Sequence, residues 1–208
     1  MSDLVTSPSR GRPRSEASRS AIIVAASQLL RTVGLQRMTV EAVAERSGVG
    51  KATIYRWWSS KGMLALDAYL EDMRSKVVPP DTGDGQEDFR QHTLAVLNFY
   101  GGEDGKVFAQ FIAEGQSDPQ LGEAFRQRFL VHRRATVRAI WQRGVERGDF
   151  RDDIDADVAI DMLFGPLIYR LLAGHQPLTK SFAKALTEVA LNGLCKCPER
   201  ALTSGSSR

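Results

Sequence analysis

The 208-residue sequence predicts an all-α fold of about nine helices. Apolar residues recur at intervals of three and four along most of the chain, which is the spacing of one face of a helix. Glycine, proline and helix-capping residues separate these segments. No segment shows convincing strand character. The length and an apolar content of 42% allow one or two compact units with a sizeable core.

Four helices are predicted in the N-terminal third, over 18–33, 39–47, 51–57 and 60–78. Gly34 and Gly48 can take the backbone conformation that ends a helix. Thr39 offers the N-cap of the second helix, and Ser59 or Ser60 offers that of the fourth, which two prolines terminate. Five further helices are expected over 86–100, 105–116, 119–147, 155–173 and 179–195.

Charge is distributed unevenly along the chain. Residues 1–62 contain ten Lys and Arg against four Asp and Glu, whereas the remaining residues contain eighteen against twenty-one. Because attraction to phosphate falls off over a Debye length, concentrated positive charge suits a local nucleic-acid-binding module. A basic surface without such a partner is the alternative that charge alone leaves open.

The segment that points to DNA is VEAVAERSGVGKATIYRW, residues 40–57. Small Ala44 and Gly48 allow two short helices to cross closely, while apolar residues such as Val43, Ile54 and Trp57 fill the angle between them. The outer face of the second helix then presents hydrogen-bond donors to the major groove. The pattern predicts a helix-turn-helix, with a helical hairpin that has a solvated polar face as the alternative.

From about Ser18 to Tyr69 the chain resembles the TetR family, most specifically in the stretch TVEAVAERSGVGKATIYRWWSSKGML. The resemblance implies a three-helix DNA-binding domain at 16–62 and a helical ligand-binding and dimerisation domain at 63–197. The basic arm 1–15 and the tail 198–208 are expected to be disordered.

Carried over by position, the resemblance assigns base reading to Lys51 and Thr53, and phosphate contacts to Thr39, Tyr55 and Lys61. Trp57 stands where the family often has His or Tyr, so its contact depends on the indole N–H as a donor. The full set of predicted DNA-binding residues is Arg12, Arg14, Thr39, Gly50, Lys51, Thr53, Tyr55, Arg56, Trp57 and Lys61.

Upstream, Arg10-Gly11-Arg12-Pro13-Arg14 resembles the core of an AT-hook. An extended arm of this kind places arginine side chains in the minor groove of A/T-rich DNA. A solvated tail without a DNA contact is the alternative.

The helix predicted over 155–173 has an apolar arc too wide for one covering partner. With the helix over 179–195 it is expected to form a two-fold four-helix bundle with a second chain, as the resemblance implies. Burial wholly within one chain is the alternative. The predicted dimer residues are Ile160, Phe164, Leu167, Ile168, Leu171, Leu186, Val189 and Ala190.

The resemblance also implies a pocket for an unknown small-molecule effector among the middle helices. Apolar and aromatic residues there are the candidates, with ordinary core packing as the alternative for each. They are Tyr69, Met73, Phe89, Tyr100, Phe108, Phe111, Phe125, Phe129 and His132.

Other classes of protein find no support in the sequence. His92, His132 and His175 lack neighbours at metal-ligand spacing, so neither a metal nor a cofactor is expected. No nucleophile elbow or strand-preceded phosphate loop indicates an enzyme. Cys195 and Cys197 are interpreted as free thiols. The absence of a secretion signal and of a long apolar run predicts a cytoplasmic protein without a membrane span.

These observations predict a ligand-responsive transcriptional regulator, in particular a repressor. It is expected to bind double-stranded DNA at an inverted repeat as a homodimer and to be released by a small molecule. The alternative is a DNA-binding architectural or activator protein without small-molecule induction.

Overall fold

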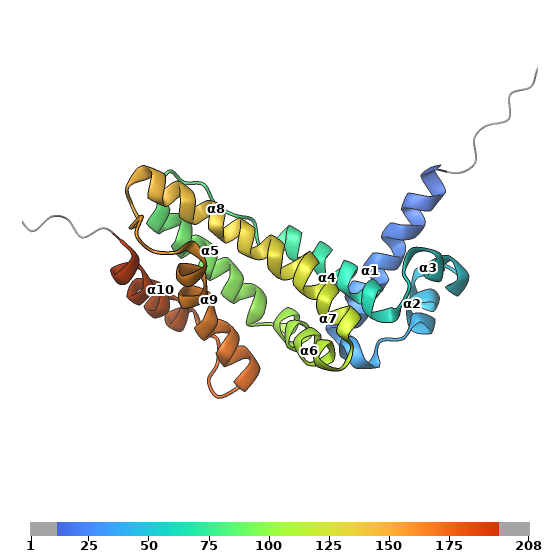
Figure 1. Ribbon diagram of the computed structural model, residues 1–208. Helices are drawn as coiled ribbons and strands as arrows, with labels where there is room; N and C mark the ends of the chain where they lie inside the picture. The colour runs from blue at the N-terminus through green and yellow to red at the C-terminus, as the bar shows by residue number, and fades with distance from the viewer. Residues whose placement is uncertain (1–11, 196–208) are drawn as a thin grey trace, which may run out of the picture. The chain divides into compact units, whose positions relative to one another are not determined.

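The computed structural model describes residues 12–195, with side chains from residue 16 onward (Figure 1). The described residues divide into two compact units. The first unit holds 12–76 and 102–129, and the second holds 77–101 and 130–195. The chain passes from one unit to the other after residues 76, 101 and 129. The units are therefore not the same as the two consecutive domains that the sequence predicts on either side of residue 62.

Helices make up both units (Figure 1). The first contains α1 (Arg12–Arg37), α2 (Val40–Ser47), α3 (Lys51–Trp57), α4 (Lys61–Lys76), α6 (Glu103–Ser117) and α7 (Pro119–Phe125). The second contains α5 (Gly85–Tyr100), α8 (Val131–Arg147), α9 (Ala156–Ala173) and α10 (Lys180–Leu194). Over residues 12–195 the β pairing is limited to an isolated bridge between Phe150 and Cys195. The all-α prediction is confirmed.

The predicted helix boundaries at glycine and threonine have the expected local cause. Gly34 has a φ of 78° and interrupts α1, and Gly48 has a φ of 67° at the C-cap of α2. These left-handed conformations favour glycine, which has no Cβ to clash. The Thr39 hydroxyl accepts a hydrogen bond from the Ala42 N–H at 3.1 Å and caps the start of α2.

Two expectations about helix extent were wrong. The backbone of α1 begins at Arg12, so Arg12 and Arg14 are helical there and do not belong to an extended arm. The single helix expected over 119–147 is interrupted by a π-helical turn at Arg126–Leu130. A π turn inserts a residue into the helical repeat, and this one lies where the chain passes from the first unit to the second.

The core of the first unit joins α1, α2, α4, α6 and α7. Ile22, Ala26, Val43 and Leu64 are fully buried. The short α2 packs against both α1 and α3, so α2 and α3 are held by tertiary contacts and not by helix propensity alone.

The core of the second unit centres on three aromatic rings. Trp141 stacks on Phe150 with a centroid distance of 4.9 Å, and Phe89 meets Phe150 edge-on at 5.0 Å. A Cβ added at Gly144 of α8 would lie 2.2 Å from the Phe150 ring, so only glycine permits this approach. Gly144 therefore lets the turn after α8 pack closely enough for Phe150 to contact α5.

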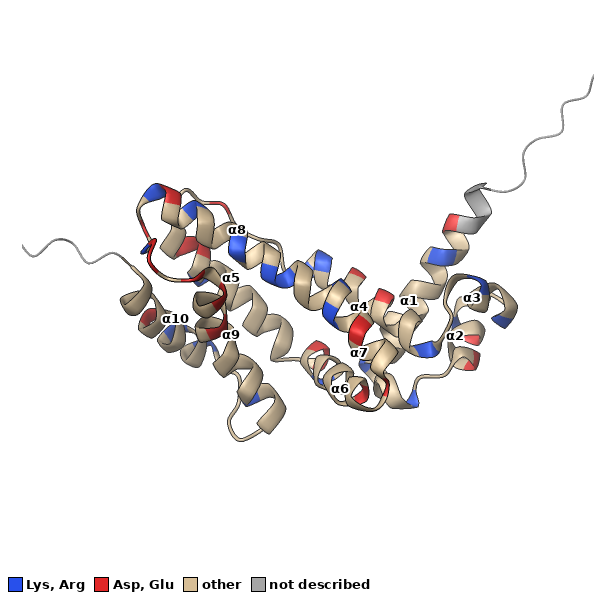
Figure 2. Cartoon of the chain, viewed as in Figure 1, with Lys and Arg blue, Asp and Glu red and all other residues tan. Residues whose placement is uncertain are grey.

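The arginines of α8, visible as blue segments in Figure 2, are paired within the second unit. Arg134 and Arg138 bind the Asp157 carboxylate at 2.8 and 2.6 Å. Arg143 and Arg147 face the fully buried Asp88 at 3.5 and 3.7 Å. Four of the five α8 arginines are therefore paired with acids of their own unit.

Two features of residues 12–195 bear on function. No helix among them combines the length and the apolarity that crossing a bilayer requires. No cluster of three or more His, Cys, Asp and Glu among them is arranged to hold a metal ion. Cys195 is a free cysteine, and Cys197 lies outside the described residues.

Candidate nucleic-acid interface

The helix-turn-helix is built by α2 and α3, which pack against each other, and α2 also packs on α1. Val43 of α2 and Ile54 of α3 are buried between the helices. Gly50 is the exposed N-cap of α3, and the backbone N–H of Thr53 donates to its carbonyl at 2.9 Å. With the inner face fixed in this way, the opposite face of α3 is left open to solvent.

The outer face of α3 carries the residues that the sequence proposed for DNA. Lys51, Tyr55 and Arg56 are exposed, with 55% of Tyr55 accessible, and Thr53 is half-buried. Figure 2 shows basic segments on α3 and at the turn that follows it. The structure thus gathers donors of three kinds, an ammonium, a guanidinium and a phenol, on one short helix.

Lys51 has an acidic partner, Glu41, at the start of α2. Its Nζ donates to Oε1 of Glu41, in the first turn of α2, at 3.0 Å. A hydrogen bond from its own backbone N–H, followed by the contacts with Lys51, lowers the pKa of the Glu41 carboxyl. Glu41 therefore remains a carboxylate beside Lys51 at neutral pH, and sequence reasoning did not single it out.

Thr39 and Lys61 frame α3 from the starts of α2 and α4. The start of each of these helices has free N–H groups and the positive end of the helix dipole. Ser60 caps α4 by accepting from the Met63 N–H at 3.2 Å, and Lys61 Nζ donates to the Gln36 carbonyl at 3.0 Å. Of the two serines expected as caps, Ser60 fills the role.

The two tryptophans at the end of α3 lie differently from the prediction. Trp57, expected to fill the angle between the helices, is 37% exposed, whereas Trp58 is buried. Trp58 leaves α3 with an extended backbone, φ −130° and ψ 125°, which turns its indole into the unit. The exposed Trp57 indole is consequently free to meet a partner at the end of the reading face.

A half-buried carboxylate, that of Asp67, ties the end of α3 to the rest of the first unit. Trp58 Nε1 donates to Asp67 Oδ2 of α4 at 2.8 Å, and Arg128 of the π turn donates to the other Asp67 oxygen. Arg19 of α1 lies 3.8 Å from Asp67 and covers the Trp58 ring. The sequence prediction missed this cluster, although an aspartate within the apolar stretch of α4 was a visible signal.

Comparison with known proteins agrees with this geometry. Residues 22–68 match the family model of bacterial regulatory proteins of the tetR family, and residues 79–190 match the tetracyclin repressor-like C-terminal domain. The uncharacterized HTH-type transcriptional regulator YdeS of Bacillus subtilis is 36% identical over 185 residues, which cover 89% of this chain and 93% of YdeS. The chain belongs to the TetR family.

Solved structures of transcriptional regulators show the same fold. The transcription regulator SCO0332 is 35% identical, covers 87% of this chain and 99% of its own, and superposes with a TM-score of 0.76. FadR from Bacillus subtilis, solved in complex with stearoyl-CoA, is 17% identical with a TM-score of 0.63, over 84% of this chain and 98% of its own. At that identity the second likeness concerns the fold alone.

The residues proposed to line an effector pocket of this TetR-family chain separate into groups. The rings of Tyr69, Phe108, Phe111, Phe125 and Phe129 pack together in the first unit, with centroid distances of 4.9 to 5.7 Å along the group. Met73 is buried in the same unit. Phe89 and Tyr100 are buried in the second unit, and His132 is exposed on α8. His132 therefore does not belong to either interior.

The second unit holds a polar pair, a buried histidine and a half-buried arginine, that the prediction did not name. His92 of α5 lies 3.0 Å from Arg133 of α8 through its Nε2. Burial, and then the charge of Arg133, lowers the pKa of His92 to about 3. Because a guanidinium only donates, Nε2 accepts and the neutral imidazole carries its proton on Nδ1.

The residues proposed for the dimer interface fall on two faces of α9 and α10. Ile160, Leu167 and Ala190 are buried inside their own chain, so their assignment to an interface was wrong. Phe164, Ile168, Leu171 and Leu186 are half-buried, and Val189 is 72% exposed. The outward face of α9 instead carries Val158, Met162, Tyr169 and Leu172, which are all exposed.

The Asp67 cluster can be tested by Asp67→Asn, which keeps the shape of the side chain and removes its charge. We expect the free energy of unfolding to fall by about 1–3 kcal/mol, because three donors lose a charged acceptor in a partly buried site. Urea denaturation followed by circular dichroism measures the change. Glu71→Gln on the same helix breaks only an exposed pair with Arg74 and should cost less than about 0.5 kcal/mol; equal losses in the two variants would contradict the role of Asp67.

Proposed function

We propose that this TetR-family chain binds a palindromic DNA operator as a homodimer and represses transcription until a small molecule releases it. The observation that carries the proposal is the outer face of α3, where exposed donors stand on a helix anchored at both ends. A helix held in this way keeps its side chains in register when it enters the major groove. The TetR-family relatives, which are transcriptional regulators, support the same reading.

Within the interface, Lys51 and Thr53 are assigned to base edges, and Thr39, Tyr55 and Lys61 to phosphates. The Glu41 carboxylate beside Lys51 favours this division, because it repels a phosphate group while leaving the ammonium able to reach an uncharged base acceptor. Arg56 and Trp57 extend the donor surface. The side chains of Arg12 and Arg14 lie outside the described residues, so their minor-groove contact remains a proposal from the sequence.

Dimerisation is assigned to the outward faces of α9 and α10. Val158, Met162, Tyr169 and Leu172 follow one another at helical spacing and form an exposed apolar stripe. Gly165 lies within that stripe with open space around it, which permits close approach of a second helix. Two reading helices related by a two-fold axis then meet half-sites about 34–36 Å apart.

Membership of the TetR family supports release by an effector, and so does FadR from Bacillus subtilis, a regulator of similar fold that has been solved with stearoyl-CoA. The aromatic group of the first unit and the His92–Arg133 pair offer apolar and polar contacts within each unit. A DNA-binding architectural or activator protein without induction is the second candidate, and it shares the exposed face of α3.

Base reading by Lys51 predicts different phenotypes for two lysines. After selection of bound duplexes from random sequence, Lys51→Ala should lose about 1–3 kcal/mol of affinity for the selected site and relax its base preference. Lys61→Ala should weaken all duplexes alike and reduce the salt slope by about 1. Gel-shift titrations at several salt concentrations measure both, and equal behaviour of the two variants would remove base reading from Lys51. Wild-type protein that binds scrambled duplex equally well would favour the architectural alternative.

The interface on α9 and α10 predicts that Val189→Glu yields a monomer, because two-fold symmetry brings the new charges into apolar surroundings. Light scattering after size exclusion, at micromolar concentration, gives the mass. Val131→Glu, at an exposed valine of α8, is the matched control and should remain dimeric. A monomeric wild type, or a dimeric Val189→Glu, would show that the chains do not associate through this face.

Induction predicts that a small molecule which binds the regulator weakens its hold on the operator. A coupling free energy of about 1–3 kcal/mol corresponds to roughly a 5- to 150-fold loss of DNA affinity. A screen by thermal shift, followed by gel-shift titration with each hit, measures this loss. Hits that stabilise the protein and leave operator affinity unchanged would count against induction.

A further inference from the structure

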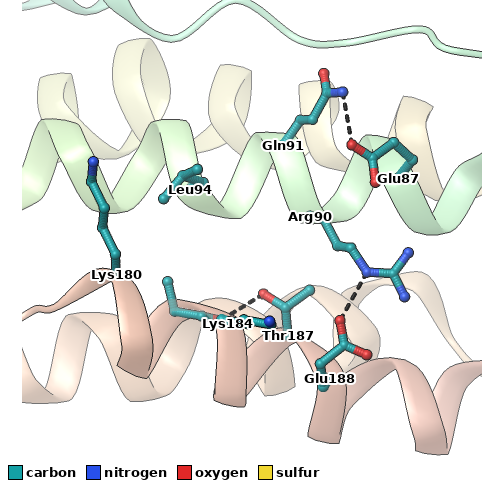
Figure 3. A pocket seen from close by; sticks show the side chains of 9 residues that line it. Glu87, Arg90, Gln91, Leu94, Lys180, Lys184, Thr187 and Glu188 are labelled. Carbon is teal, nitrogen blue, oxygen red and sulfur yellow. Dashed lines mark hydrogen bonds and ion pairs between the residues drawn. The ribbon is translucent and has the colours of Figure 1, made fainter.

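A groove runs between α5 and α10 on the surface of the second unit (Figure 3). It encloses about 450 Å³, which is within the range of small-molecule sites. Leu94 contributes an exposed apolar side chain from α5, and Ala183 and Thr187 contribute from α10. None of the residues proposed for the effector, for DNA or for the dimer lines this groove.

One end of the groove is closed by polar groups that satisfy one another. Arg90 Nε donates to Glu188 Oε1 at 2.8 Å, and Gln91 Nε2 donates to Glu87 Oε1 at 2.9 Å, as the dashed lines in Figure 3 show. The Thr187 hydroxyl donates to the Ala183 carbonyl at 2.8 Å. Both acids that line the groove are therefore engaged, and the threonine turns its hydroxyl to its own helix.

The other end has an excess of positive charge. Lys180 and Lys184 are exposed and one helical turn apart. Neither forms an ion pair within 4.0 Å in the described part of the chain, although the charge of Lys184 also acts on Glu188. In Figure 3, Lys180 extends from α10 towards α5. Lys180 is also the first residue of α10, where the helix dipole adds to the positive potential.

We propose that this groove binds a small amphipathic carboxylate. The carboxylate lies between Lys180 and Lys184 at the N-terminus of α10, and the apolar body lies along Leu94 and Ala183. The polar pair of Arg90 and Glu188 limits the length of the ligand. The site needs neither DNA nor a second chain, so this proposal can be tested independently of the proposed regulation.

The test uses the full chain and decanoate as the probe, in isothermal titration at low salt. Decanoate should bind, and decanol, which has the same chain without the charge, should bind at least about tenfold more weakly. Lys184→Glu and Lys180→Glu should each weaken decanoate by a similar factor. Lys106→Glu reverses the charge of an exposed lysine on α6 and should leave the affinity unchanged.

The place of binding is checked by amide chemical shifts during the same titration. Shifts concentrated on 87–94 and 180–188 support the proposal. It is overturned if decanoate does not bind at millimolar concentration, if decanol binds as tightly, if the shifts map elsewhere, or if Lys106→Glu weakens binding as much as Lys184→Glu.

Discussion

The carboxylate of Asp67 is the constraint on which the geometry of the reading helix depends. A short helix such as α3 has little stability of its own, so its position follows from what holds its ends. Gly48 sets the turn before it, and the bond from Trp58 to Asp67 sets its exit. Since Arg19 and Arg128 converge on the same carboxylate, α1, α4 and the π turn all bear on the orientation of α3.

This arrangement gives the π turn at Arg126–Leu130 a structural reason. Phe129 of the turn is buried against the rings of Tyr69 and Phe125, while Arg128, its neighbour, reaches Asp67. The extra residue of a π turn changes the direction in which successive side chains leave the helix. The turn thus supplies one side chain to the aromatic core and the next to the carboxylate, at the point where the chain leaves the first unit.

Local signals in the sequence were sufficient for the helices and for the outer face of α3. Thr39 and Gly48 act through their own backbone, so their effects are readable from neighbouring residues alone. The sequence could not show which tryptophan is buried. Trp57 and Trp58 lie three and four residues after Ile54, and either spacing places a side chain on the same helix face as Ile54. The faces of α9 were ambiguous for a related reason: apolar residues surround the helix, and only tertiary contacts decide that Ile160 faces its own chain while Met162 faces outward.

The pairing of the α8 arginines has a consequence for how the molecule presents its charge. A guanidinium already matched by a nearby carboxylate contributes little to the field at a distance. The cations at the reading face are Lys51, Arg56 and Lys61, on α3 and at the start of α4, and these are far fewer than the basic composition suggests. The number of counterions released on DNA binding, and hence the dependence of affinity on salt concentration, would be set by that small group. The positive potential of the same group would orient the reading face towards DNA before contact.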